Sequence, residues 1–304
     1  MAQSVLLGDP RYFQIKAGAN PHTRDFWGRR KQVDQKVACA QWRNLKETLE
    51  GQGVKVHVLP AVPDLPGLVF PANAGFRFGN KIYLSNLNPT RAAEKEHYRQ
   101  FLSNLGFAVA DFPVGEPSEG EADFFPAGDP YLFTYGRMER PRWVFRLGVP
   151  PYRRVYGFRS DLQVLETLRS IATGHEVIPL ELVQEAHYHG DTALCVFGPR
   201  REYLLAYLQA FSESAQNVLR QRFGDRLVPL SETDGRQFAA NSFQIIVRRN
   251  GEQIPVLLMP DGLTERLYQG VRARGVIPCP VDVSEFLEKG GGAVKCMLLD
   301  LGEM

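Results

Sequence analysis

The segment Gly290–Met297 reads GGGAVKCM and leads into the apolar run LLDL near the C-terminal end of the chain. Three consecutive glycines let a backbone approach a ligand closely and adopt positive φ angles. Cys296 stands directly before the strand that this run predicts, and the neighbouring Lys295 favours a lowered thiol pKa. The segment therefore predicts a reactive cysteine at the mouth of a strand, with a buried strand cysteine behind a loop as the alternative.

A second segment, HYHGDTAL over residues 187–194, carries a base and a carboxylate. His189 and Asp191 are two residues apart, so on an extended chain their side chains point the same way. This spacing predicts one pocket that both side chains face. His187 stands two residues before His189, so its side chain would point to the same side, and a metal site is a second interpretation. Against it, no other His/Cys cluster supplies further ligands at a familiar spacing. A surface His-Asp turn is the third interpretation.

Two further segments carry polar candidates. The acidic loop SEGEADFF (118–125) contains Glu119, Glu121 and Asp123, which could orient a histidine or hold a cationic substrate. In LPGLVFPANAG (65–75), Asn73 could offer an amide to a ligand. A solvated loop and a simple Asn turn are the structural alternatives.

The composition excludes several classes of protein. The 304 residues are 44% hydrophobic and 23% charged, which is ordinary for a globular chain. A net charge of only +2 is lower than is typical of a nucleic-acid-binding protein. No apolar run approaches the ~18 residues of a membrane helix, and the N-terminal residues do not resemble a signal peptide. Four cysteines are too few for a disulfide framework, so we expect a reduced, cytoplasmic protein.

Strands and amphipathic helices alternate along the chain in units of roughly 60 residues, of which five fit. The predicted strands and hairpins cover residues 54–60, 76–85, 143–148, 192–198, 243–259 and 294–301. The predicted helices cover residues 36–51, 92–106, 161–171, 200–223, 263–274 and 284–289. No linker separates them, and no clean internal repeat is visible in the letters. The rhythm predicts an α/β fold with mixed sheets in one domain.

The order of the short motifs is more specific than any one of them. Along the chain stand GANP (18–21), LPGLVFPANAG (65–75), EGEAD (119–123), YGFRSD (156–161), YHGDTAL (188–194), FAANSF (238–243) and GGGAVKCM (290–297). This order resembles the guanidino-group-modifying, or pentein, superfamily. Its members include arginine deiminases, dimethylarginine dimethylaminohydrolases, amidinotransferases and cyanobacterial-type arginine dihydrolases. The resemblance extends over nearly the whole chain.

The resemblance implies a five-bladed α/β propeller, built from pseudo-fivefold ββαβ-type modules around a central channel. It implies a single catalytic domain over residues 1–304. An unusual insertion near residues 128–150 separates the acidic loop from YGFRSD.

The resemblance also implies roles for individual residues. Cys296 would be the nucleophile and His189 the general acid/base, with Asp191 binding the substrate guanidinium. Glu119 would orient His189, although the extra residue in EGEAD lets Asp123 share or take that role. The substrate-binding residues that the resemblance implies in addition are Asn20, Asn73, Asp123, Arg159 and Asn241.

Two positions depart from the superfamily pattern. Gly67 replaces an Asp that relatives carry before the Phe-x-x-Asn segment, and Gly190 replaces a Leu between the histidine and the aspartate. The loss of a side chain at Gly67 predicts vacated volume that would admit a larger or N-substituted guanidine.

The function that the resemblance implies is hydrolysis of a guanidino C–N bond of arginine or a modified arginine. The reaction would pass through a covalent cysteine-thiouronium intermediate and would need no metal or organic cofactor. The expected partner is a small guanidino compound, not a nucleic acid or a membrane, and a homo-oligomer stays open. The alternatives are amidino transfer on the same scaffold and a catalytically degenerate propeller that only binds, which the presence of both Cys296 and His189 disfavours.

Overall fold

The computed structural model describes residues 3–16, 18–145, 152–249 and 251–304. Within these ranges, fifteen strands form five three-stranded sheets, and two more form a separate hairpin. The sheets, each written in its spatial order, are β17(Leu298–Glu303), β1(Gln3–Gly8), β2(Lys55–Leu59); β3(Gly75–Phe78), β4(Lys81–Leu84), β5(Ala108–Asp111); β6(Phe124–Pro126), β7(Tyr131–Gly136), β10(Val177–Leu182); β11(Leu194–Phe197), β12(Tyr203–Ala206), β13(Leu227–Pro229); and β14(Phe243–Arg249), β15(Glu252–Pro260), β16(Ile277–Val281).

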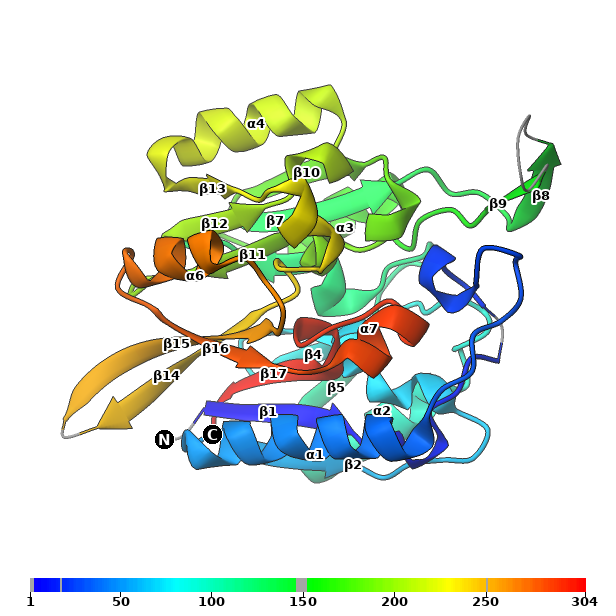
Figure 1. Ribbon diagram of the computed structural model, residues 1–304, viewed down its shortest axis with the longest axis horizontal. Coiled ribbons are helices and arrows are strands. Elements are labelled where there is room, and N and C mark those ends of the chain that lie inside the picture. Colours follow the sequence, from blue (N-terminus) through cyan, green and yellow to red (C-terminus); the bar gives the residue numbers. More distant parts are fainter. Residues whose placement is uncertain (1–2, 17, 146–151, 250) are drawn as a thin grey trace.

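All five sheets repeat one strand pattern. The central strand runs antiparallel to one neighbour and parallel to the other. A helix connects the central strand to its parallel neighbour, as such connections usually require. These five helices are α1(Gln35–Gly51), α2(Glu94–Asn104), α3(Leu165–Ile171), α4(Glu213–Phe223) and α6(Glu265–Arg272). Because β17 pairs with β1, the two ends of the chain lie in one sheet (Figure 1).

Local sequence explains why these elements form where they do. The side chain of Asp34 accepts hydrogen bonds from the backbone N–H groups of Lys36 and Val37, which caps α1. The buried residues of α1 are Ala38, Gln41, Leu45 and Leu49, a spacing of three to four residues that lays one face of the helix on the core. Among the described helices, none is long and apolar enough to cross a membrane.

A short turn precedes the first strand of each unit. Four of these turns are 3₁₀ helices, at Pro71–Ala74, Gly120–Ala122, Gly190–Thr192 and Lys295–Met297. They contact one another, so four segments far apart in the sequence meet in space. The fifth turn, residues 238–242 before β14, carries Asn241, which bonds to the turn at Cys296. The fold therefore gathers the five turns into one cluster.

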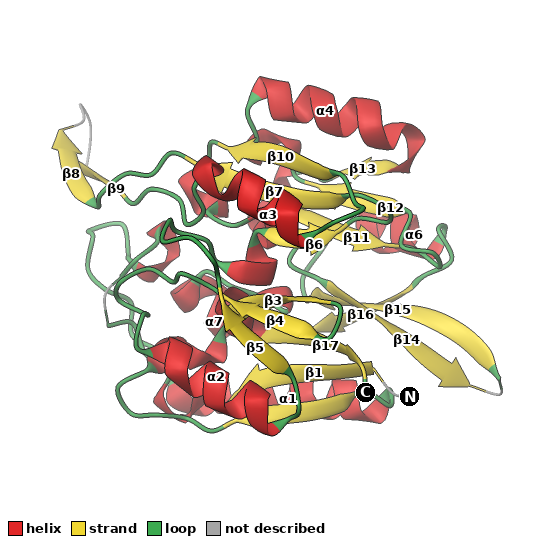
Figure 2. Ribbon diagram, turned by 180° about the vertical axis from the view of Figure 1, so that it is seen from behind, coloured by secondary structure: helices red, strands yellow, loops and turns green. Residues whose placement is uncertain are grey.

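Two sequence predictions about elements are wrong. The predicted helix over residues 200–223 contains the strand β12 as well as α4, because the run YLLA (203–206) pairs with β11 and is buried in the core. The predicted insertion near 128–150 includes β7, which is the central strand of its sheet. The additional structure is instead a hairpin of β8(Arg142–Phe145) and β9(Tyr152–Val155), which projects from the body of the protein (Figures 1 and 2). Residues 146–150 of the predicted insertion lie outside the described residues.

Candidate active site

Cys296 is the buried middle residue of the turn Lys295–Met297, and two side chains hold its sulfur. Its Sγ donates a hydrogen bond to Oδ2 of Asp191 over 3.2 Å and accepts one from Nδ2 of Asn241 over 3.1 Å. The Asn241 side-chain oxygen accepts hydrogen bonds from the backbone N–H groups of Cys296 and Ala293. The amide of Asn241 therefore fixes both the backbone and the sulfur of the candidate nucleophile.

The glycines before Cys296 are required by close packing. Gly291 follows the end of α7(Ser284–Gly290) with φ = 79°. Residues other than glycine rarely adopt this left-handed backbone conformation. A Cβ at Gly292 would lie 2.8 Å from the Cβ of Cys296. The three glycines thus let the chain turn sharply and pass against the cysteine.

His189 is held between two carboxylates that both lie in the acidic loop. Its Nδ1 is 2.9 Å from Oδ2 of Asp123, and its Nε2 is 3.2 Å from Oε2 of Glu119. The Nε2 atom also lies 3.1 Å from Nδ2 of Asn73. A protonated imidazole can donate to Glu119, and a neutral one can accept from Asn73, so the site supports both protonation states.

The carboxylate of Asp123 uses all its acceptor positions within the protein. Besides His189, it accepts hydrogen bonds from the hydroxyls of Ser160 and Thr134 and from the backbone N–H of Gly190. A Cβ at Gly190 would lie 2.3 Å from Oγ1 of Thr134. Gly190 therefore leaves room for the threonine that helps to hold Asp123, which explains this departure from the superfamily pattern.

Burial and charge shift the ionisation of these groups. Burial alone would lower the pKa of His189, but Asp123 and Glu119 raise it to about 9. Burial opposes ionisation of Glu119, but the hydrogen bond and charge of His189 lower its pKa to about 2. Burial raises the pKa of Asp191 to about 6. Near neutral pH the site thus holds an imidazolium between two carboxylates.

The thiol of Cys296 differs from the sequence expectation. Burial and the adjacent carboxylate of Asp191 raise its pKa well above the ordinary value. Lys295 acts to lower this pKa, as expected, but burial and Asp191 outweigh it, and its ammonium group bonds to Glu121 over 2.6 Å. The thiol is therefore protonated in the ligand-free protein.

The space beside Gly67 is filled, which contradicts the predicted vacancy. A Cβ at Gly67 would lie 2.2 Å from Oε1 of Glu94 and 2.7 Å from Nε of Arg91. Arg91 pairs with the buried Glu94 over 2.7 Å and donates to the backbone carbonyl of Gly67. It also donates to Oδ1 of Asn73 over 2.7 Å, so the amide nitrogen of Asn73 faces His189. No sequence motif pointed to Arg91 or Glu94; their spacing of three residues at the start of a helix is the one available signal.

Cys296, His189, Glu119 and Asn73 line one cavity of about 150 Å³. Two further residues predicted from the sequence, Asn20 and Arg159, also line it. Asn20 donates to the hydroxyl of Tyr188 and to the carbonyl of Gly290. The guanidinium of Arg159 lies over the ring of Tyr188 and donates to the carbonyl of Ala19.

Three predicted residues are placed differently. Asn241 does not line the cavity, because its amide is fully occupied by Cys296, Ala293 and Asp191. Asp123 lies behind His189 and orients it. Asp191 does not line this cavity either: it lines a separate cavity of about 70 Å³ together with Glu121 and Lys295, and its buried Oδ1 has no hydrogen-bond partner.

The metal site that HYHGD left open does not form. His187 packs between the rings of Tyr207 and Phe238, and burial lowers its pKa to about 4. Across the described ranges, no group of three His, Cys, Asp or Glu side chains is arranged to hold a metal ion.

A family model, related sequences and related structures all indicate the same family. The family model "N,N dimethylarginine dimethylhydrolase, eukaryotic" matches residues 9–122 and 155–302. The chain is 29% identical to the N(G),N(G)-dimethylarginine dimethylaminohydrolase of Mycobacterium tuberculosis, over 96% of this chain and 83% of the relative. It is 28% identical to the bifunctional arginine dihydrolase/ornithine cyclodeaminase AgrE of a Nostoc species, over 98% of this chain but only 38% of the relative.

Solved structures agree. The substrate-bound N-terminal domain of ArgZ, a cyanobacterial arginine dihydrolase, is 25% identical, with a TM-score of 0.81 over 99% of this chain and 98% of that one. A dimethylarginine dimethylaminohydrolase with a bound S-methyl-L-thiocitrulline adduct shares the fold at 18% identity, with a TM-score of 0.69 over 99% of this chain and all of that one. The fold is thus the α/β fold of these hydrolases, and the chain belongs to the N,N-dimethylarginine dimethylhydrolase family, within the pentein-type guanidino-modifying superfamily.

Proposed function

We propose that this protein hydrolyses a guanidino C–N bond of arginine or of a methylated arginine through a covalent bond to Cys296. One observation carries this proposal: Cys296 and a histidine held between two carboxylates line the same small cavity. The family and the relatives named above support the reaction class.

The charges of the cavity suit a cationic guanidinium. Glu119 is a buried carboxylate that lines the cavity, and Asp191 is a buried carboxylate that lies against Sγ of Cys296 at its edge. We propose that charge-assisted hydrogen bonds from a planar guanidinium satisfy both. The free Oδ1 atom of Asp191 is one such acceptor. A guanidinium held there presents its carbon to the adjacent Sγ of Cys296. We assign Arg159 to the opposite end of the substrate, where its charge would bind a carboxylate.

The same contact activates the nucleophile. In the free protein Asp191 raises the pKa of the Cys296 thiol, because two negative charges would otherwise lie side by side. A bound guanidinium brings a positive charge against both groups and lowers the thiol pKa. The thiolate therefore forms in the substrate complex, and its proton is released.

The first half of the reaction forms the covalent intermediate. Sγ of Cys296 adds to the guanidino carbon, and His189, protonated in the free protein, gives its proton to the departing nitrogen. The C–N bond breaks, the amine or ammonia leaves, and a thiouronium group stays on Cys296.

The second half releases the product. The imidazole of His189, now neutral, takes a proton from water, which adds to the same carbon. The C–S bond then breaks, and a ureido product and the free cysteine remain. Asp123 keeps the imidazole in position through both halves, and Asn73 donates to the neutral form.

We further propose that the five sheets are the blades of one pentein propeller, a single domain over residues 1–304 with the β8–β9 hairpin as its insertion. The repeated strand order, the contacts among the turns and the pairing of β17 with β1 support this arrangement. A reducing, cytoplasmic location is in keeping with four cysteines that are all free.

The experiment that tests the function is a product assay in heavy-oxygen water. The purified protein is incubated with arginine, methylarginines and agmatine, and the products are identified by mass. Hydrolysis places one heavy oxygen in a ureido product. Amidino transfer, the second candidate, produces a new guanidino compound without heavy oxygen and only when an amine acceptor is present. A protein that converts no guanidino compound would refute the proposal.

A further inference from the structure

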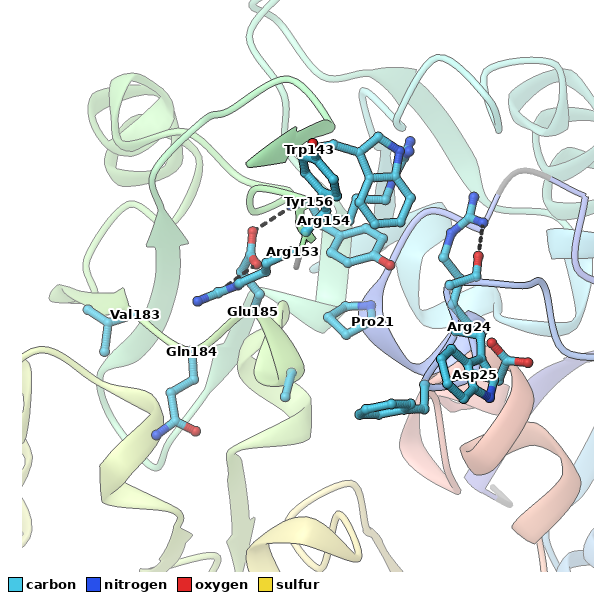
Figure 3. Close-up of a pocket in the computed structure, with 15 residues that line it drawn as sticks. Pro21, Arg24, Asp25, Trp143, Arg153, Arg154, Tyr156, Val183, Gln184 and Glu185 are labelled. Atoms are coloured by element: carbon cyan, nitrogen blue, oxygen red, sulfur yellow. Dashed lines mark hydrogen bonds and ion pairs between the residues drawn. The ribbon is translucent and has the colours of Figure 1, made fainter. Parts of the chain in front are cut away.

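The structure contains cavities that the proposed reaction does not use. A groove of about 950 Å³ lies between the β8–β9 hairpin and the loop that follows Pro21 (Figure 3), and none of its described lining residues also lines the active-site cavity. A cavity of about 70 Å³, by contrast, is lined by Asp191, whose Oδ2 bonds to Sγ of Cys296. We call it the rear cavity, and its lining includes Glu121, Pro126, Asp191, Cys195, Arg201 and Lys295. The rear cavity therefore reaches the candidate nucleophile through one carboxylate.

The turns that form the active site face both cavities. Beside the turn Gly190–Thr192, His189 lines the active-site cavity, whereas Asp191 lines the rear cavity. In the last turn, Cys296 lines the active-site cavity and Lys295 lines the rear cavity. The cluster of turns thus separates the two cavities, and the contact between Asp191 and Cys296 joins them across it.

The rear cavity can hold water that exchanges with solvent. A cavity needs about 10–15 Å³ and two to four polar partners to hold a water molecule, and this cavity has about 70 Å³. Oδ1 of Asp191 is buried without a hydrogen-bond partner, so it is one available acceptor, and Lys295 and Arg201 supply donors. At the rim, Pro126 is exposed, and Arg201 and Asp300 are partly exposed. A water molecule bound to Asp191 from this side is therefore connected to solvent.

The proposed reaction produces a proton that must leave the site, because the Cys296 thiol ionises in the substrate complex. The thiol donates to Oδ2 of Asp191, and its other side-chain contact is the amide of Asn241, which donates and cannot accept a proton. Since the pKa of His189 is raised to about 9, its imidazole is already protonated near neutral pH. Asp191 is thus the group placed to take the thiol proton. It holds a guanidinium only as a carboxylate, so the proton cannot stay there.

The substrate closes the other way out, because in the proposed complex it extends through the active-site cavity from Cys296 to Arg159. We propose that the rear cavity is the exit for the thiol proton, an inference that rests on the proposed function. The S–H bond of Cys296 breaks as an O–H bond forms on Oδ2 of Asp191. A half-turn of the carboxyl group brings the protonated oxygen to the rear cavity, where water takes the proton to solvent. Asp191 is again a carboxylate and binds the guanidinium, and Cys296 remains as the thiolate.

A side chain that fills the rear cavity should slow this step. Cys195 lines the rear cavity, and its Sγ donates to the backbone carbonyl of Ser242, so this thiol takes no part in the exit route. Cys195→Met extends the side chain into the cavity and displaces its water. Two controls accompany it: Cys195→Ala leaves the cavity open, and Cys279→Met makes the same substitution on β16, outside the lining of both cavities.

The readout is kcat/KM for S-methyl-L-thiocitrulline, measured in ordinary and in heavy water. This compound forms an adduct in the related dimethylarginine dimethylaminohydrolase structure. Its methanethiolate can leave without a proton, so the rate depends on loss of the thiol proton and not on proton donation by His189. We expect Cys195→Met to lower kcat/KM about tenfold and both controls to stay within about twofold of the wild type. The solvent deuterium isotope effect of Cys195→Met should exceed that of the wild type, because proton transfer becomes rate-limiting.

The outcomes separate the exit route from the function on which it rests. A Cys195→Met variant with the rate and isotope effect of the wild type contradicts the exit route alone. A lower rate with an unchanged isotope effect contradicts it as well, because a displaced Asp191 would then explain the loss. A wild-type protein that converts neither S-methyl-L-thiocitrulline nor any guanidino compound overturns the proposed function itself.

Discussion

The Sγ atom of Cys296 lies 3.2 Å from Oδ2 of Asp191, so the candidate nucleophile faces a carboxylate, not a cation. Burial and this contact together raise the pKa of the thiol in the free protein. The thiol is therefore held inactive until a cationic substrate arrives, which links reactivity to the charge of the substrate.

Replacement of Asp191 by Asn should lower the pKa of the Cys296 thiol while it reduces turnover. The substitution removes a negative charge beside the sulfur, so the thiolate forms at lower pH. The rate of alkylation by neutral iodoacetamide, measured against pH with peptide mapping, should reach its plateau at lower pH than in the wild type. Cys195 is the internal control, because burial raises its pKa to about 12. An unchanged alkylation profile would show that Asp191 does not control the thiol.

Replacement of Asp123 by Asn should lower kcat/KM by about 10²–10⁴-fold, the range typical of a positioned acid–base group. Asp123 is the largest influence that raises the pKa of His189, so this pKa falls in the variant. The fraction of imidazolium then decreases at lower pH, and the basic limb of the kcat/KM profile moves to lower pH. Glu121→Gln is the matched control, because this neighbouring carboxylate bonds to Lys295 and does not contact His189. Equal effects of the two substitutions would argue against an orienting role for Asp123.

Introduction of the superfamily acid at position 67 should decrease activity. The side chain of Gly67→Asp would meet Glu94 and Arg91, and would displace the arginine that orients Asn73. We expect lower kcat/KM for every guanidino compound in a panel, and Gly67→Ala should show part of the loss. Improved activity on arginine would mean that the pair moves aside easily and that position 67 is open to a substrate contact.

The Arg91–Glu94 pair should also contribute to stability. Arg91→Met leaves the buried carboxylate of Glu94 without its partner, which costs about 3–5 kcal/mol in comparable cases. Arg99→Met is the control, because Arg99 bonds to the exposed acids Glu96 and Asp111, and surface pairs are worth about 0–1 kcal/mol. The free energy of unfolding of each variant, measured by urea denaturation, distinguishes the two expected losses. Similar losses for both variants would contradict the structural role given to Arg91.

The sequence predicted the candidate site better than it predicted the elements around it. The motifs at Cys296 and His189 could be found because each lies in a short turn with unusual residues. Those turns are also a repeat: ANAGF, EADFF, DTALC, ANSFQ and KCMLL each lead from a turn into the first strand of a unit. The repeat is hidden because side chains at equivalent positions have different chemistry.

Other features depend on contacts between residues that lie far apart in the sequence, so the sequence alone could not predict them. The vacancy expected at Gly67 is filled by Glu94, which is 27 residues away and belongs to a helix. The strand within residues 200–223 looked helical because its four residues, YLLA, have no alternation of polar and apolar side chains. Both faces of such a strand are buried, and periodicity alone cannot separate it from a helix.

The most direct test of the central claim is mass analysis of the covalent intermediate. His189→Gly removes both the proton donor for a departing amine and the group that activates water, so the variant is mixed with S-methyl-L-thiocitrulline, whose methanethiolate can leave without a proton, and quenched with acid. We predict that the thiouronium intermediate accumulates, with an added mass equal to this compound less methanethiol, on the peptide that contains Cys296 and on no other cysteine peptide. An unmodified Cys296 in a variant that still consumes the substrate, or an adduct on a different residue, would contradict the assignment of the nucleophile.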